Sequence, residues 1–274
     1  MPMTALYLRR RPLLATLVTV TALCATHALA QGSPYGSNNL HPWQVPPPRL
    51  SAEAYFTNLK DGDRIETPYV LKFGLSGGWG LAPIAQAGHG KSGHHHLLVN
   101  RDLPLNFKQA LPFNDQYIHF GKGQMETVLT LAPGEYKLRM LLADQQHLPH
   151  FVYSKPTRIV VTRKNDTDPK TLQKKGLEIE LDKTSARPPL RVGFHASLLN
   201  VAQMAQRIPE SGHFRVTITP ESGAAPAVMD FVDGETEVWL SPPAGRYGVK
   251  LEMLDNLAPE RPLAEAVSAR FEVR

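Results

Sequence analysis

The chain has almost no cysteine: the only one among its 274 residues is Cys24. Thiolate ligands are therefore excluded from everything after Cys24, and imidazole is the strong ligand that remains for a divalent transition metal. Long apolar runs are scarce as well. The stretch from Leu13 to Leu23 is shorter than the about 20 residues of a membrane-spanning helix, and no later stretch offers a span. The His-Glu-x-x-His motif is also absent, which excludes the helical zinc site of many metalloproteases.

The first 30 residues have the pattern of an export signal. Three arginines, Arg9 to Arg11, precede the apolar stretch, and the small-residue pattern Ala28-Leu29-Ala30 follows it. We expect cleavage after Ala30, a soluble mature chain, and a periplasmic or secreted location. Arg10-Arg11 also loosely fits a twin-arginine signal, so general and twin-arginine export both stay open.

Charge is nearly balanced in the expected mature chain. The whole sequence has 30 basic and 25 acidic residues, and cleavage would remove three arginines and no acid, which leaves a net charge of +2. The densest basic run, between Arg163 and Lys175, lies in a polar stretch typical of a solvated linker. We therefore expect no nucleic-acid partner.

Five stretches combine β-type composition with flanking turns, and no long helical period competes with them. Tyr136, Leu138, Met140 and Leu142 alternate with Lys137 and Arg139, as a half-buried strand requires. The predicted strands are Tyr69 to Leu75, His94 to Val99, Met125 to Leu131, Tyr136 to Leu142 and Arg158 to Thr162. The sequence therefore predicts an all-β fold.

The second half of the chain repeats the first. At a shift of 111 residues, identical pairs without a gap are Phe120/Phe231, Gly123/Gly234, Glu126/Glu237, Leu129/Leu240, Gly134/Gly245, Tyr136/Tyr247 and Asp144/Asp255. Each copy has the size of an immunoglobulin-like β-sandwich, so we predict two of them in tandem. The expected boundaries are a signal at 1–30, a flexible Pro/Gly-rich lead-in at 31–60, sandwiches at 61–163 and 177–274, and a linker at 164–176.

Histidine is concentrated in the first copy, where seven of the eleven histidines lie between His89 and His150. Most do not follow the repeat: among their counterparts are Phe214, Arg215, Asp230 and Ala258, and only His94 meets a histidine, His213. A shared scaffold would not require histidines in one copy alone. We therefore interpret them as functional and predict that the metal ligands come from His94, His95, His96, His119, His147 and His150.

Three histidine-bearing motifs resemble those of a family of bacterial secreted domains called domain of unknown function 4399. They are Gly93-His94-His95-His96-Leu97-Leu98-Val99-Asn100, His119 to Glu126, and Asp144 to His150. The resemblance spans roughly Pro68 to Val161 and implies a small extracytoplasmic β-domain. It implies no catalytic residue, and Tyr117 stands where the family pattern usually has another histidine.

The chemistry of neutral imidazole suits copper or zinc. On a strand, His94 and His96 project to one face and His95 to the other, so a third ligand must come from His119 or the loop with His147 and His150. We expect Asp144 and Glu126 to hold the distal ring nitrogens.

A carrier, buffer or sensor of metal is the favoured function, with a possible envelope protein partner at the second domain. Two other functions stay open. A metal-dependent enzyme would use an open coordination position, with Glu126 as base. A structural or adhesive envelope module would use the histidines as a metal-free hydrogen-bonded network.

Overall fold

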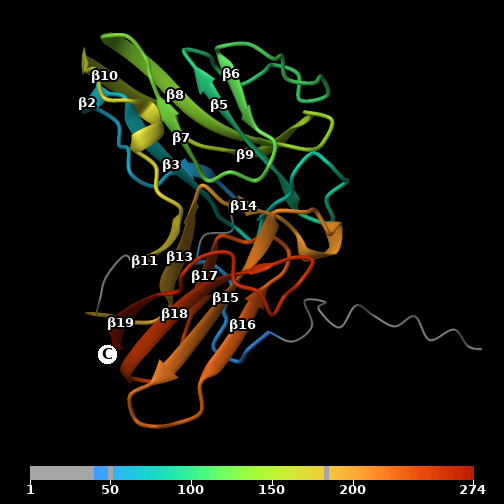
Figure 1. The fold of residues 1–274 in the computed structure, drawn as a ribbon, viewed down its shortest axis with the longest axis vertical. Helices are drawn as coiled ribbons and strands as arrows, with labels where there is room; N and C mark the ends of the chain where they lie inside the picture. The colour runs from blue at the N-terminus through green and yellow to red at the C-terminus, as the bar shows by residue number, and fades with distance from the viewer. Residues whose placement is uncertain (1–39, 49–51, 182–184) are drawn as a thin grey trace, which may run out of the picture. The chain divides into compact units, whose positions relative to one another are not determined.

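The computed structural model describes residues 40–48, 52–181 and 185–274, and nearly all regular structure in these residues is β-strand (Figure 1). The helical elements there are two single turns of 3₁₀ helix, η1 (Pro169–Thr171) and η2 (Met204–Gln206). No helix in this part of the chain is long and apolar enough to cross a membrane. The expected export signal lies outside the described residues.

The first copy is a sandwich of two sheets. Its smaller sheet has the order β1 (Ala54–Phe56), β3 (Tyr69–Leu75), β7 (Glu126–Leu129). Its larger sheet has the order β2 (Asp63–Thr67), β10 (Thr157–Lys164), β8 (Gly134–Ala143), β5 (Ser92–Val99), β4 (Gly80–Leu81), with β6 (Tyr117–Phe120) paired to β5 and β9 (Pro149–Tyr153) paired to β8. Apolar side chains from both sheets fill the space between them, among them Phe73, Leu97 and Met140, which are fully buried.

The second copy repeats this arrangement. Its smaller sheet has the order β11 (Gly176–Leu181), β13 (Leu190–Ser197), β17 (Glu237–Leu240). Its larger sheet has the order β12 (Ser185–Ala186), β19 (Val267–Val273), β18 (Gly245–Asp255), β15 (Ser211–Pro220), β14 (Asn200–Val201), with β16 (Ala227–Phe231) paired to β15. The prediction of two tandem immunoglobulin-like β-sandwiches is confirmed.

Equivalent core residues make equivalent contacts in the two copies. The rings of Phe73 and Phe120 pack with centroids 4.7 Å apart, and the corresponding rings of Phe194 and Phe231 pack at 4.8 Å. The five predicted strands of the first copy correspond to β3, β5, β7, β8 and β10. Along β8, Leu138, Met140 and Leu142 are buried while Lys137 is partly exposed, because alternate residues of a strand face opposite sides of the sheet.

Reciprocal hydrogen bonds join the two copies. The amide of Val201 donates to the carbonyl oxygen of Gly123 over 3.0 Å. With the copies exchanged, the amide of Leu81 donates to the carbonyl oxygen of Gly234 over 2.8 Å. Val201 and Leu81 occupy equivalent places in β14 and β4, so each copy gives the other the same contact. Such exchange is the property of an interface with two-fold symmetry.

An acid from each copy also faces the other copy. Glu126 in β7 is 6% exposed, and its Oε2 lies 2.9 Å from both the Nε2 of His195 and the Oγ of Ser197. Burial raises the pKa of this carboxyl, but contacts with His195, Gln173 and Ser197 outweigh that effect and hold the pKa below its ordinary value. Glu126 is therefore a charged acceptor at neutral pH that ties β7 to β13.

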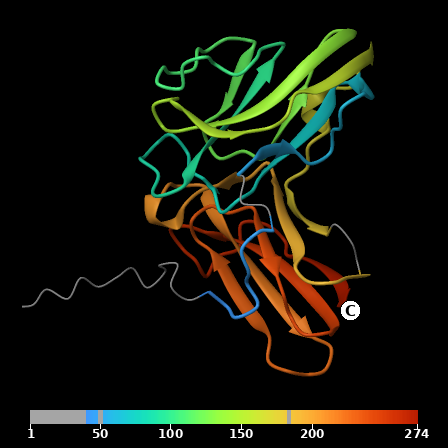
Figure 2. The same cartoon turned by 180° about the vertical axis from the view of Figure 1, so that it is seen from behind.

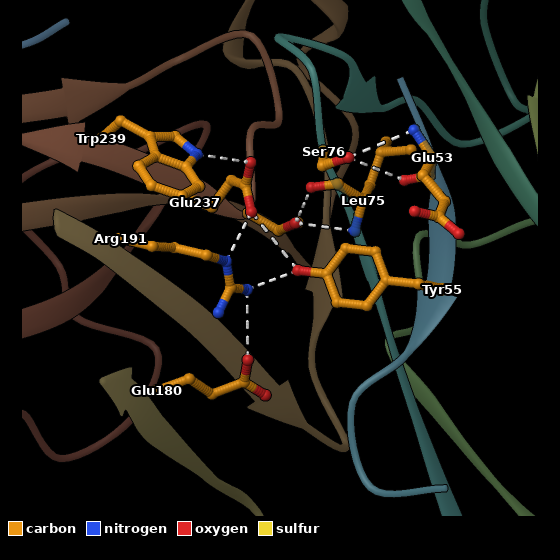
Figure 3. A network of polar contacts seen from close by, with 9 residues as sticks. Glu53, Tyr55, Leu75, Ser76, Glu180, Arg191, Glu237 and Trp239 are labelled. Carbon is orange, nitrogen blue, oxygen red and sulfur yellow. Dashed lines mark hydrogen bonds and ion pairs between the residues drawn. The ribbon is translucent and has the colours of Figure 1, made fainter. Parts of the chain in front are cut away.

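Glu237, the counterpart of Glu126, is the centre of a second network (Figure 3). Its Oε2 accepts hydrogen bonds from the Nε of Arg191 (2.7 Å) and the hydroxyl of Tyr55 (3.4 Å), and its Oε1 accepts one from Trp239 (3.2 Å). Arg191 also contacts the Tyr55 hydroxyl and, at 3.3 Å, Glu180. Because Tyr55 belongs to β1 and the other groups to the second copy, this network ties the two copies together.

The expected flexible lead-in, residues 31–60, contains regular structure where it is described. Gln44 forms a β-bridge with Leu240, and the amide of Val45 donates to the carbonyl oxygen of Trp239 (2.9 Å). Figure 2 shows this segment, in blue, beside strands of the second copy. The stretch also includes β1, which pairs with β3. Residues 31–39 and 49–51 lie outside the described part.

Candidate metal centre

Strand β5 has neighbouring strands on both sides and contains three consecutive buried histidines. It pairs with β8 on one side and with β6 on the other, and His94, His95 and His96 are each at most 1% exposed. The rings of His94 and His96 lie against each other with centroids 4.6 Å apart, whereas His95 packs against Phe73 in the sandwich core. The alternation of side chains along a strand accounts for this division.

His94, His119 and His147 form a cluster in which one ring nitrogen from each residue lies within 4.8 Å of the other two. His119 belongs to β6 and stands opposite His96 in the strand register. His147 lies in the loop between β8 and β9, at a φ of +62°. Its amide donates to the carbonyl oxygen of Asp144 (2.9 Å) and its own carbonyl oxygen accepts from the amide of Leu111 (2.9 Å). Cross-strand pairing and loop hydrogen bonds thus bring together residues that are distant in the sequence.

His96 borders this cluster on the same face of β5. Its Nε2 lies 2.8 Å from the Nε2 of His94, a distance at which one neutral ring donates a hydrogen bond and the other accepts it. Its ring centroid lies 5.6 Å from that of His147 and 5.9 Å from that of His119.

The rings of His94, His96 and His119 are held neutral. Burial, reinforced by the neighbouring histidines, lowers the pKa of His94 to about 3 and the pKa of His96 to about 2. Burial also lowers the pKa of His119, with His147 adding to the effect. A neutral imidazole keeps a lone pair, which is the form that binds a metal ion.

Several buried ring nitrogens of the cluster have no hydrogen-bond partner. Among the described residues they include the Nδ1 atoms of His94, His96 and His119 and the Nε2 atom of His147. Buried polar atoms in folded proteins are rarely left unpaired, because their desolvation then goes uncompensated. A divalent cation among these nitrogens would satisfy lone pairs that the protein leaves unused, so the residues present fit a metal ion.

Two histidines of the predicted ligand set are not brought to the cluster. His95 faces the sandwich core, with its ring centroid 5.0 Å from that of Phe73. His150 in β9 places its Nε2 3.1 Å from the carbonyl oxygen of Ser92 and its ring 4.7 Å from Trp79. The ring of His150 is thus packed against Trp79 and away from the cluster. We leave His95 and His150 out of the ligand set proposed below.

The two acids expected to orient the ligands have other partners. Glu126 contacts His195 and Ser197 of the second copy, as described above. Asp144 organises the loop that carries His147, since its Oδ1 accepts from the amides of Gln146 (2.8 Å) and Leu148 (2.9 Å). Asp144 therefore positions His147 through the backbone, and Glu126 belongs to the contact between the copies.

Phe113 is part of the site, although the sequence does not mark it. Its ring packs edge-on against both His119 and His147, with centroids 4.5 Å apart in each case, and it remains 61% exposed. Phe113 therefore contacts the rings of His119 and His147 on the side that faces solvent. No periodicity or motif around Phe113 indicates this role, because it depends on how the loop after β5 folds back.

The equivalent place in the second copy holds different polar contacts. The Nδ1 of His213, counterpart of His94, lies 2.8 Å from the Oδ1 of Asn256. Arg215 and Asp230, counterparts of His96 and His119, are opposite one another in β15 and β16 and form a two-pronged ion pair at 2.6 and 2.9 Å. The register that pairs two histidines in the first copy pairs opposite charges in the second.

Solved structures of fibronectin-type domains are among those similar to this chain. The fibronectin(III)-like modules of Clostridium thermocellum CbhA are 10% identical, with 81% of this chain and 94% of that chain covered and a TM-score of 0.26. A two-domain fibronectin type III segment of chicken tenascin is 14% identical, with 80% and 97% covered and a TM-score of 0.23. The chicken interferon gamma receptor alpha chain is 9% identical, with 82% and 99% covered and a TM-score of 0.26.

No curated protein sequence matches the chain. The family model called domain of unknown function, DUF4399, matches it twice, over residues 71–162 and 192–274. These two matches fall on the two sandwiches and include the three histidine motifs of the first. The chain therefore belongs to the DUF4399 family and carries two copies of its domain.

Proposed function

We propose that the protein binds one copper or zinc ion through His94, His119 and His147 and acts as an exported metal carrier, buffer or sensor. The observation that carries the proposal is the convergence of three imidazoles, each with one ring nitrogen within 4.8 Å of those of the other two. Unpaired buried nitrogens on all three rings support it. Ligands of this kind are typical of copper and zinc sites.

The restriction of the cluster to one copy also supports a specific role. Both copies have the same strand pairing, so the fold can be built without the histidines. In the second copy, Arg215 and Asp230 satisfy each other at the place of His96 and His119. His96 and His119 stand at this place in the first copy, where two imidazoles form no such ion pair with each other. The second copy is then free to serve as a scaffold or to contact another envelope protein.

Export is the remaining part of the proposal, and it rests on the signal pattern of the first 30 residues. A test is to express the full-length chain in a bacterial host and to locate it by cell fractionation. Recovery of a shortened protein outside the cytoplasm supports export. Recovery of the full-length chain in the cytoplasm contradicts it.

The metal proposal is tested by metal content. The mature chain, purified without a histidine tag, is equilibrated with Cu²⁺ or Zn²⁺, dialysed and analysed for metal per chain. We expect about one equivalent in the native protein and a loss of at least tenfold in affinity in His94→Ala, His119→Ala and His147→Ala. His89→Ala removes an exposed histidine outside the cluster and serves as the matched control.

Thermal melts of each variant show whether the fold survives the substitution. Absence of bound metal in the native protein after equilibration with either ion would contradict the proposal and leave a structural envelope module. Equal loss in His89→Ala would show that the binding is unspecific.

A further inference from the structure

Measured between ring centroids, His96 lies as close to the histidine cluster as the members of the cluster lie to one another. Within the cluster, the ring centroids are 5.1 Å apart for His94 and His147, 5.3 Å for His119 and His147, and 5.9 Å for His94 and His119. The centroid of His96 lies 4.6, 5.6 and 5.9 Å from those of His94, His147 and His119. The four rings therefore surround one common point.

These distances match the size of a four-imidazole metal site. A nitrogen ligand binds at about 2.0–2.1 Å, so each ring centroid lies about 3 Å from the ion and tetrahedral ligands have centroids about 5 Å apart. The six observed distances extend from 4.6 to 5.9 Å. The Nε2 atoms of His94 and His96 are also close enough, at 2.8 Å, to be neighbouring ligands of one ion.

A second role for His96 competes with this one. The same 2.8 Å contact can be a hydrogen bond through which His96 orients the ring of His94. A ring used only for orientation has no need to stand opposite His119 in the strand register, and this placement favours direct ligation.

We propose that His96 is the fourth ligand and that the four imidazoles form a closed centre, with no coordination position left for water or a substrate. The inference rests on the metal binding proposed above. Metal sites with three protein ligands and one open position carry out catalysis, whereas sites with four protein ligands hold the ion. The closed set thus assigns the protein to the retention or transfer of metal, and the edge-on contacts of Phe113 cover the solvent side of two of the ligands.

The experiment loads the mature protein with Cu²⁺ alone and compares the native chain with His96→Ala and His96→Gln. Electron paramagnetic resonance reports the nitrogen ligands of the copper, and titration with azide reports an open coordination position. We expect azide to bind the native protein at least tenfold more weakly than His96→Ala, and the spectrum of either variant to show fewer nitrogen ligands. His89→Ala is expected to behave as the native protein.

The outcomes separate this inference from the function on which it rests. If the native protein retains Cu²⁺ and both His96 variants keep its spectrum and its azide affinity, the closed centre is wrong while metal binding stands. Restoration of the native spectrum by glutamine, which can hydrogen-bond His94, would identify His96 as a positioning residue and also overturn the inference. If the native protein retains no Cu²⁺, both proposals fail. Should His96→Ala not fold, His96→Gln decides, because it preserves side-chain volume.

Discussion

His94, His95 and His96 are neighbours in the chain, yet their side chains meet different surroundings. His94 and His96 face other imidazoles, whereas His95 is fully buried beside Phe73. Burial lowers the pKa of His95 to about 3, so the ring is neutral at physiological pH. Both of its nitrogens are nevertheless unpaired, which makes His95 a source of instability in the first sandwich.

Replacement of His95 by leucine is expected to stabilise the metal-free protein. The change removes two desolvated polar atoms and keeps an apolar group of similar size, so the free energy of unfolding should rise by about 1–2 kcal/mol. Denaturant unfolding measures the effect, and metal content should not change. His195→Leu is the contrasting variant, because it removes one of the hydrogen bonds to the buried carboxylate of Glu126 and should destabilise. A loss of stability in His95→Leu would contradict the prediction.

The free energy of unfolding is expected to depend on pH because of Glu235. Burial, with the nearby carboxylate of Asp233 adding to it, raises the pKa of Glu235 from 4.5 to about 7. The folded protein therefore prefers the protonated acid, so this contribution to stability is complete below pH 4.5 and is lost as the pH rises to 7 and above. Glu235→Gln should match the native protein at pH 4 and exceed its stability at pH 8 by roughly 1–3 kcal/mol. Thermal melts across this range measure the difference, and equal melting temperatures at pH 8 would contradict the assignment.

The strand pair β5 and β6 differs in chemistry between the two copies. Its counterpart, β15 and β16, has the same antiparallel register. Cross-strand neighbours lie close enough to interact directly, so the pair at this position decides what the element binds. Two imidazoles leave lone pairs available, whereas Arg215 and Asp230 neutralise each other.

Introducing the arginine–aspartate pair of the second copy into the first should preserve the fold and abolish metal binding. In the double variant His96→Arg/His119→Asp, we expect an ion pair across β5 and β6, a melting temperature near that of the metal-free native protein, and no retained Cu²⁺ or Zn²⁺. Circular dichroism and metal analysis give the two measurements. Retention of about one equivalent of metal would show that the ion binds elsewhere.

At the scale of the whole molecule, the two copies are joined as the subunits of a symmetric dimer are. Gly123 and Gly234 make the same contact in opposite directions, at φ values of +85° and +82°. A Cβ atom on Gly123 would lie 1.9 Å from the carbonyl oxygen of Val201, and one on Gly234 would lie 2.2 Å from that of Leu81. Both copies have glycine at this position because the backbone of the other copy occupies the space that a side chain would need.

Substitution of either glycine by alanine should weaken the contact between the copies. We expect Gly123→Ala and Gly234→Ala each to lower the free energy of unfolding by about 3 kcal/mol or more, since a backbone clash adds to the strain of a positive φ. Gly223→Ala is the matched control, because Gly223 has a φ of +83° and open space around its Cβ position. It should cost only about 1 kcal/mol. Equal losses at all three positions would contradict a role of the interface.

The histidine motifs were identifiable from the sequence because imidazole is chemically distinctive, but their division into cluster and non-cluster residues was not. His150 shares a motif with His147, yet its ring lies against Trp79. His195 shows no pattern in the sequence and still pairs with Glu126, 69 positions away. Such partners depend on which strand edges meet, and local periodicity carries no information about that.

The sequence by itself determined the β-type strands, the duplication and the concentration of histidine in one copy, because alternation, repeated identities and residue type are local properties. Only the tertiary structure decided which histidines converge, that β7 and β17 place their acids against the other copy, and that the shared glycines lie at this contact. The physical reason is that register, loop closure and the packing of one sandwich on another set the distances between residues that are remote in the chain.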